Sequence, residues 1–222
     1  MHLPEPQHRL FLQWLIFFST VFVLLVFVWY RGGFHFILAS DSTRITLFIG
    51  LIFFVALGHG ALRAWRVSCE LNHLSAFANK GDWVPSSSVV GSYLNHQNLN
   101  DEEQGEKRLD DVLSERMRGP QEIGWFLSGL LVKLGLLGTV IGFIFMLGSV
   151  ADLESLDISD AQDLIQRMTK GMGVALVTTL VGLTASMITG FQYLMIDRGA
   201  DRLISGAYLL ASEKRAARAS KP

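Results

Sequence analysis

Four long stretches of apolar residues constrain the fold of this chain more than any other feature. They cover about residues 10–30, 45–65, 125–150 and 171–196, and none of them contains an aspartate or a glutamate. The hydrocarbon core of a bilayer is about 30 Å thick, so about 20 apolar residues suffice for one helical crossing. The pattern predicts an all-α, polytopic membrane protein with four transmembrane helices and a small helical cytoplasmic region.

The positions of lysine and arginine predict the orientation, because cytoplasmic loops carry an excess of them. Residues 63–124 contain seven and the tail after residue 196 contains six, whereas the opposite loops, 31–44 and 151–170, contain four together. Both termini and the middle loop are therefore expected in the cytoplasm.

These features divide the chain into regions. Residues 1–66 hold the two N-terminal transmembrane helices, and residues 67–124 form a cytoplasmic helical loop. Residues 125–196 hold the second transmembrane pair with an acidic periplasmic loop between its helices, and residues 197–222 form a basic cytoplasmic tail.

Shorter signals refine the loops. Residues 67–79 extend the second helix into the cytoplasm, and residues 81–88 form a turn. An amphipathic helix over residues 101–117 is expected to end near Gly119-Pro120. Ser159 and Gln162 have the spacing of a capping box, which predicts that a helix begins there and continues into the fourth span.

The sequence contains no arrangement typical of an enzyme. Cys69 is the only cysteine, and no zinc-ligand spacing, phosphate-binding loop or nucleophile elbow is present. We therefore expect no catalytic residue, metal site or cofactor.

The third and fourth spans are rich in small residues, which mark helix–helix contacts in lipid because they allow the backbones to approach closely. The helix-packing candidates are Gly135, Gly138, Gly142, Gly171, Ala175, Gly182 and Ser186.

Two threonines in these spans are candidates for a polar layer. If the helices are antiparallel, Thr139 and Thr179 lie at a similar depth, roughly 20–26 Å from the cytoplasmic end at 1.5 Å per residue. The alternative is that each hydroxyl bonds a carbonyl of its own helix.

At this point the residues carry a family resemblance. Residues 133–142 read KLGLLGTVIG and residues 171–183 read GMGVALVTTLVGL. The two segments resemble the signatures LGLLGTVxG and GxxxALxxTxxGL of the MotA/TolQ/ExbB proton channel family. They occur in the expected order and in antiparallel spans.

The resemblance implies a proton channel, built as a homopentamer around two single-span partner helices similar to ExbD, TolR or MotB. Each partner would carry a membrane aspartate. The resemblance places Thr139 and Thr179 on the ion path, with Thr178 beside them, and makes protons (or sodium) the transported ion. The complex would be a rotary, stator-like motor that energises a periplasmic or outer-membrane process.

The residues agree with this picture in one respect. Proton transfer at membrane depth usually needs an ionisable carrier, and these spans contain no carboxylate. The acid must come from a partner, or the chain is not a proton channel. His59, near a cytoplasmic end, is either packed at the interface or part of a relay. Lys133 either faces a cytoplasmic vestibule or snorkels to the headgroups.

The chain also departs from parts of the family. TolQ and ExbB usually carry a glutamate where this chain has Val174. Four spans favour the MotA branch, but a cytoplasmic loop of about 58 residues is short for contact with a flagellar rotor. Two alternatives remain: a non-conducting membrane scaffold and a self-sufficient small-solute channel.

Overall fold

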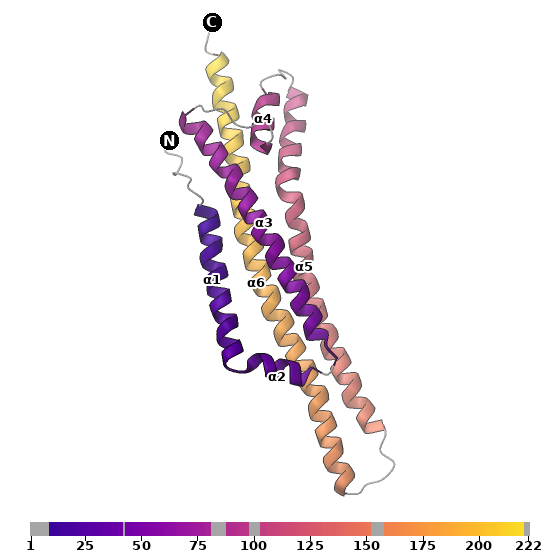
Figure 1. Cartoon of the computed structure of the whole chain (residues 1–222). Coiled ribbons are helices and arrows are strands. Elements are labelled where there is room, and N and C mark those ends of the chain that lie inside the picture. Colours follow the sequence, from indigo (N-terminus) through magenta and orange to yellow (C-terminus); the bar gives the residue numbers. More distant parts are fainter. Residues whose placement is uncertain (1–8, 42, 81–87, 98–102, 152–157, 220–222) are drawn as a thin grey trace. The chain divides into compact units, whose positions relative to one another are not determined.

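The computed structural model describes residues 9–41, 43–80, 88–97, 103–151 and 158–219, and every regular element in these ranges is a helix. Figure 1 labels the elements in chain order. They are α1 (Arg9–Tyr30), α2 (Gly33–Ser40), α3 (Ile45–Lys80), α4 (Val89–Gln97), α5 (Glu103–Ala151) and α6 (Ile158–Ala219).

Four of these helices are long and apolar enough to cross a membrane, namely α1, α3, α5 and α6. The prediction of an all-α, multi-pass membrane protein is therefore confirmed. The turn predicted at residues 81–88 lies outside the described residues except for Ser88, and so does the middle of the acidic loop, residues 152–157.

The extension of the second span into a longer helix is confirmed, because α3 runs without a break to Lys80. The helix that precedes the fourth span begins at Ile158, one residue before the predicted capping serine, Ser159. The basic tail is also helical: α6 continues to Ala219. Leu203, Ala207 and other apolar residues at helical spacing explain this, because they are buried.

The predicted helix end near Gly119-Pro120 is wrong, because α5 passes through Pro120 as one helix of 49 residues. A proline lacks the N–H that would bond the carbonyl four residues earlier, that of Arg116, yet the helix continues. The next residue, Met117, is held by contacts with side chains. The Met117 carbonyl accepts a hydrogen bond from Arg63 Nη2 (3.0 Å) and one from Gln121 Nε2 (3.1 Å). Met117 itself is also buried.

The contacts divide the chain into two compact units, and α1, α3, α5 and α6 each contribute to both. Unit 1 contains the described residues of 1–17, 59–124 and 192–222, and unit 2 contains residues 18–58 and 125–191.

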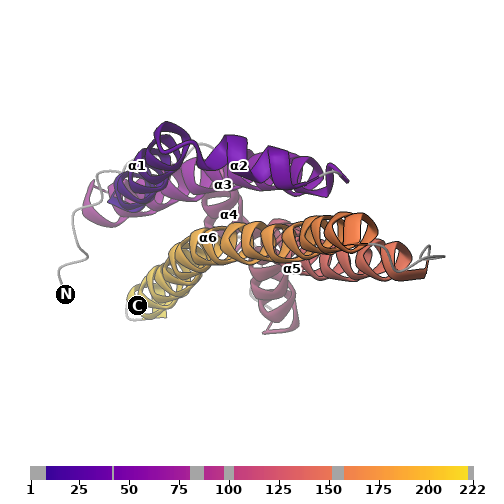
Figure 2. The same cartoon turned by 90° about the horizontal axis from the view of Figure 1, so that it is seen from below.

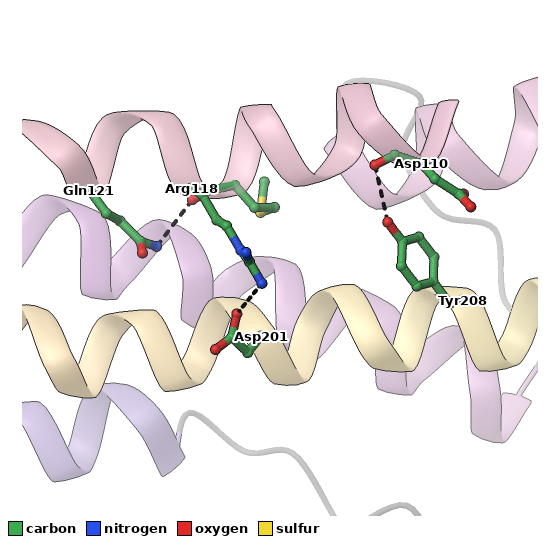
Figure 3. A network of polar contacts seen from close by, with 6 residues as sticks. Asp110, Arg118, Gln121, Asp201 and Tyr208 are labelled. Atoms are coloured by element: carbon green, nitrogen blue, oxygen red, sulfur yellow. Dashed lines mark hydrogen bonds and ion pairs between the residues drawn. The ribbon is translucent and has the colours of Figure 1, made fainter. Parts of the chain in front are cut away.

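Unit 1 has an apolar core built from four helices. Leu74 of α3, Tyr93 of α4, Leu113 of α5 and Leu203 of α6 are buried together in it. Figure 3 shows α5 beside α6 here, with Tyr208 Oη donating to the Asp110 carbonyl (3.1 Å). The core therefore packs α3 and α4 against the α5–α6 pair.

The short helix α4 is attached to α3 by one carboxylate. Glu70 accepts hydrogen bonds from the Ser88 hydroxyl (2.7 Å), from Val89 N (3.1 Å) and from Val90 N (3.3 Å). Val89 N and Val90 N belong to the first turn of α4, where backbone N–H groups lack partners within the helix, and Ser88 directly precedes it. A carboxylate at this end also interacts favourably with the helix dipole.

Unit 2 contains a smaller apolar core. Ile49, Phe53 and Leu57 of α3 pack with Leu131 of α5 and Ala185 of α6, and all five are buried. Seen from below in Figure 2, α5 and α6 again lie side by side in this unit. The core therefore holds α3 against the α5–α6 pair.

A tight turn joins α1 to α2. Gly32 has φ 73°, a left-handed conformation that glycine adopts without cost. None of the residues of α2 is buried, and Phe34, Phe36 and Leu38 expose apolar side chains.

The carboxylate of Asp41 holds the turn that starts α3. It accepts hydrogen bonds from the Thr43 hydroxyl (2.6 Å), from Thr43 N (3.0 Å) and from Thr46 N (2.7 Å). Burial raises the pKa of Asp41, but these hydrogen bonds outweigh burial and leave the pKa below its usual value.

We predict that Asp41→Ala lowers the free energy of unfolding by about 1 kcal/mol near pH 7, the usual cost of a lost helix cap. The folded-state pKa is the lower one, so the stabilisation is fully present above the unfolded-state pKa of about 3.9 and is lost as the pH falls through the folded-state value. Thermal unfolding in detergent should show the two proteins converging in acid. A gap that stays the same at every pH would contradict this account.

Candidate functional site

Glycines bring α5 and α6 of unit 2 into backbone contact. A Cβ atom on Gly135 would lie 3.3 Å from Gly182 Cα, and one on Gly142 would lie 2.6 Å from the Gly171 carbonyl oxygen. A side chain on Gly138 would overlap that of Thr178. Larger residues at these positions would therefore push the two helices apart.

The contact also shows the direction of packing. Gly135 meets Gly182, whereas Gly142 meets Gly171 and Ala175, so residue numbers rise along α5 as they fall along α6. The two helices are antiparallel. One more contact continues the series, because Ser128 Oγ donates to the Ser186 carbonyl and lies 3.1 Å from Ser186 Oγ. The small residues named from the sequence all lie in this contact.

The hydroxyls of Thr179 and Thr139 meet the same turn of α5. Thr179 Oγ1 donates across the helix contact to the Gly135 carbonyl (3.1 Å), and Thr139 Oγ1 donates to the next carbonyl of its own helix, Leu136 (2.6 Å). Both threonines are partly exposed. The alternative of a bond within the same helix thus holds for Thr139 but not for Thr179, and two partly exposed threonines from two helices contact one turn of α5.

Thr178, the neighbouring ion-path candidate, lies elsewhere on α6. It is fully buried, and its hydroxyl donates to the carbonyls of Val174 (2.8 Å) and Ala175 (3.2 Å) of its own helix. Its side chain occupies the space left by Gly138. Thr178 therefore packs α6 against α5.

Two further positions singled out from the sequence, Lys133 and Val174, lie in different environments. Lys133 is exposed on α5. Val174, where TolQ and ExbB usually carry a glutamate, is 2% exposed and packs as an apolar residue. In the described part of the chain, no group of His, Cys, Asp or Glu side chains could hold a metal ion.

A polar cluster in unit 1 was not recognised from the sequence. His59 Nδ1 lies 2.7 Å from the hydroxyl of Tyr193, and Arg63, one turn further along α3, is 8% exposed. The residues that could have indicated this cluster in the sequence are Gly60 and Gly124. A Cβ atom on either would overlap a side chain of α6, that of Gln192 at Gly60 and that of Tyr193 at Gly124.

The fold and the α5–α6 contact define a multi-pass helical membrane protein whose last two spans are in backbone contact. A model of the MotA/TolQ/ExbB proton channel family matches residues 87–207. The chain belongs to this family. The match covers α4, α5 and most of α6, including both threonine positions. Comparisons with curated proteins and with solved structures returned no match.

We predict that Gly142→Ala destabilises the helix pair by about 1–3 kcal/mol, the usual cost of overpacking, because the new methyl group would meet backbone atoms of α6. Gly129→Ala is the matched control, since no heavy atom lies within 4 Å of its Cβ position. Thermal unfolding in detergent compares the two variants. Equal stability of both would contradict the backbone contact.

Proposed function

We propose that the chain is the ion-conducting subunit of a proton-driven, stator-like motor in a bacterial inner membrane, with both termini in the cytoplasm. Protons (or sodium ions) move down their gradient past Thr139 and Thr179. The work is passed to a periplasmic or outer-membrane process by a partner protein.

The observation that carries the proposal is the pair of hydroxyls at one turn of α5. Thr179 Oγ1 donates to the Gly135 carbonyl and Thr139 Oγ1 to the Leu136 carbonyl, and each side chain is partly exposed. A hydroxyl has one donor hydrogen and two acceptor lone pairs. Each threonine can therefore accept a hydrogen bond from a protonated carboxyl group as it stands, and can donate to the ionised form once it releases its carbonyl partner. Family membership supports the same role.

The apolar stretches contain no carboxylate, and a proton carrier at membrane depth normally needs an ionisable group. The proposal therefore includes a single-span ExbD/TolR/MotB-like partner that supplies a membrane aspartate. Five copies of this chain would surround two partner helices. Protonation and deprotonation of the aspartate would move those helices relative to the ring.

A non-conducting scaffold is the second candidate, favoured by the extent of the glycine contact between α5 and α6. It requires close helix packing but no exposed hydroxyl. The two functions therefore differ in the expected effect of removing a hydroxyl without changing side-chain shape.

We predict that Thr179→Val lowers ion conduction by about tenfold, which corresponds to about 1.4 kcal/mol. The matched control is Thr189→Val, because Thr189 is fully buried and bonds only the Ala185 carbonyl of its own helix (2.8 Å). Proton flux into liposomes that contain the complex with its partner gives the measurement. Equal conduction by both variants and the unchanged protein would contradict a role for the Thr179 hydroxyl in the ion path, and no flux through the unchanged complex would favour the non-conducting scaffold.

We also predict the composition of the complex extracted gently from its own membranes. Native mass spectrometry should find five copies of this chain with two copies of a small single-span protein that carries a membrane aspartate. A homo-oligomer without an acidic partner in repeated mild preparations would argue against the motor.

A further inference from the structure

Two glycines make room for a polar layer in unit 1. Gln192 and Tyr193 are adjacent on α6 and fully buried. Gln192 occupies the space beside Gly60 of α3, and the Tyr193 ring occupies the space beside Gly124 of α5. Burying polar side chains is costly unless they are hydrogen-bonded. At this level of the fold, polar side chains therefore occupy positions that apolar side chains could fill.

At one side of this layer is the imidazole of His59. Its Nδ1 lies 2.7 Å from Tyr193 Oη, with an angle of 31° between the ring planes. His59 is partly exposed, whereas Tyr193 is fully buried. The layer thus has one accessible polar group, and that group is the one attached to the buried tyrosine.

His59 is the only histidine in the four apolar stretches, which contain no aspartate or glutamate. Histidine is the side chain that ordinarily changes charge between about pH 5 and pH 8. The predicted cytoplasmic end of its span, near residue 65, is about 9 Å further along the helix at 1.5 Å per residue.

We propose that His59 exchanges the transported protons with the cytoplasm, and that Tyr193 holds its ring in place. This inference rests on the proposed function, and it adds a titratable residue of this chain to the acid that the partner supplies.

The hydrogen bond to Tyr193 permits this exchange without rearrangement. When the hydrogen is on Nδ1, Nδ1–H donates to Tyr193 Oη and the lone pair of Nε2 is the base. A proton that binds Nε2 converts the neutral imidazole into an imidazolium and leaves the Nδ1–H···Oη bond in place. Loss of the same proton from Nε2 to water restores the neutral ring. No other bond changes.

Among the described residues, one hydroxyl and two guanidinium groups act on His59. Tyr193 faces it from α6, and Arg63 and Arg66 act on it from its own helix. The α5 residue in the layer, Gly124, does not titrate. Arg63 Nη2 is engaged by the Met117 carbonyl (3.0 Å). The imidazole is therefore the group of this layer that can take up a proton at Nε2 and still keep its hydrogen bond to Tyr193.

The test measures proton flux through the complex with its partner in liposomes, at several values of pH on the cytoplasmic face. In His59→Gln, the Gln amide replaces the imidazole but cannot take up a proton. We expect its flux to fall by about tenfold or more, as when a positioned proton carrier is lost, and the pH dependence between about pH 5 and pH 8 to disappear. His73→Gln, on the same helix but outside the apolar stretch, should keep the original profile.

Two further variants separate proton exchange from a structural role. Tyr193→Phe keeps the ring beside Gly124 and removes only the hydroxyl, so the midpoint of the pH profile should shift. In His59→Ala, imidazole added to the buffer should restore flux, because a diffusible base replaces the missing one.

An unchanged pH profile in His59→Gln, or in Tyr193→Phe if the first variant does not assemble, would overturn the inference and leave the proposed function standing. No flux through the unchanged complex would remove both. Failure of imidazole to restore flux to an assembled His59→Ala complex would count against exchange at this residue.

Discussion

The close approach of α5 and α6 is the interaction on which the rest of the structure depends. In lipid the surroundings of a helix are as apolar as its side chains, so helices associate through packing and interhelical hydrogen bonds. Gly135, Gly142, Gly171 and Gly182 bring backbone atoms of the two helices together. Only at this separation can Thr179 reach the Gly135 carbonyl. The candidate ion path therefore depends on the glycines of the facing surfaces, because they have no side chain to hold the two helices apart.

Much of this could be predicted from the sequence, because membranes make local composition informative. A stretch of about 20 apolar residues has few alternatives to a helical span. Small residues repeat at helical spacing, so they indicated which surfaces of α5 and α6 meet. Thr139 and Thr179 could be placed at one level from residue counts alone, since a helix has a fixed rise. The environment of Thr178, one residue from Thr179, could not be predicted, because it depends on the rotation of α6 about its own axis.

Contacts between distant segments were not predictable. His59 and Tyr193 are 134 positions apart, and each is common in ordinary interfacial helix ends. Glu70 falls in the predicted extension of the second helix, but nothing in the sequence indicates that its carboxylate holds the first turn of α4. Pro120 led to the opposite kind of error, because it predicted the end of a helix that in fact continues. Its local effect on a helix is well defined, but Arg63 and Gln121 bond the neighbouring Met117 carbonyl and α5 continues.

The short helix α2 has a consequence for the lipid around the protein. Its eight residues rise about 12 Å, far less than the thickness of the hydrocarbon core, so α2 cannot cross the bilayer. Phe34 and Phe36 nevertheless expose their rings. Aromatic and apolar side chains on such a segment fit the boundary between acyl chains and headgroups. The link between the first two spans therefore has the length and the exposed side chains of a segment that lies along the membrane surface rather than across it.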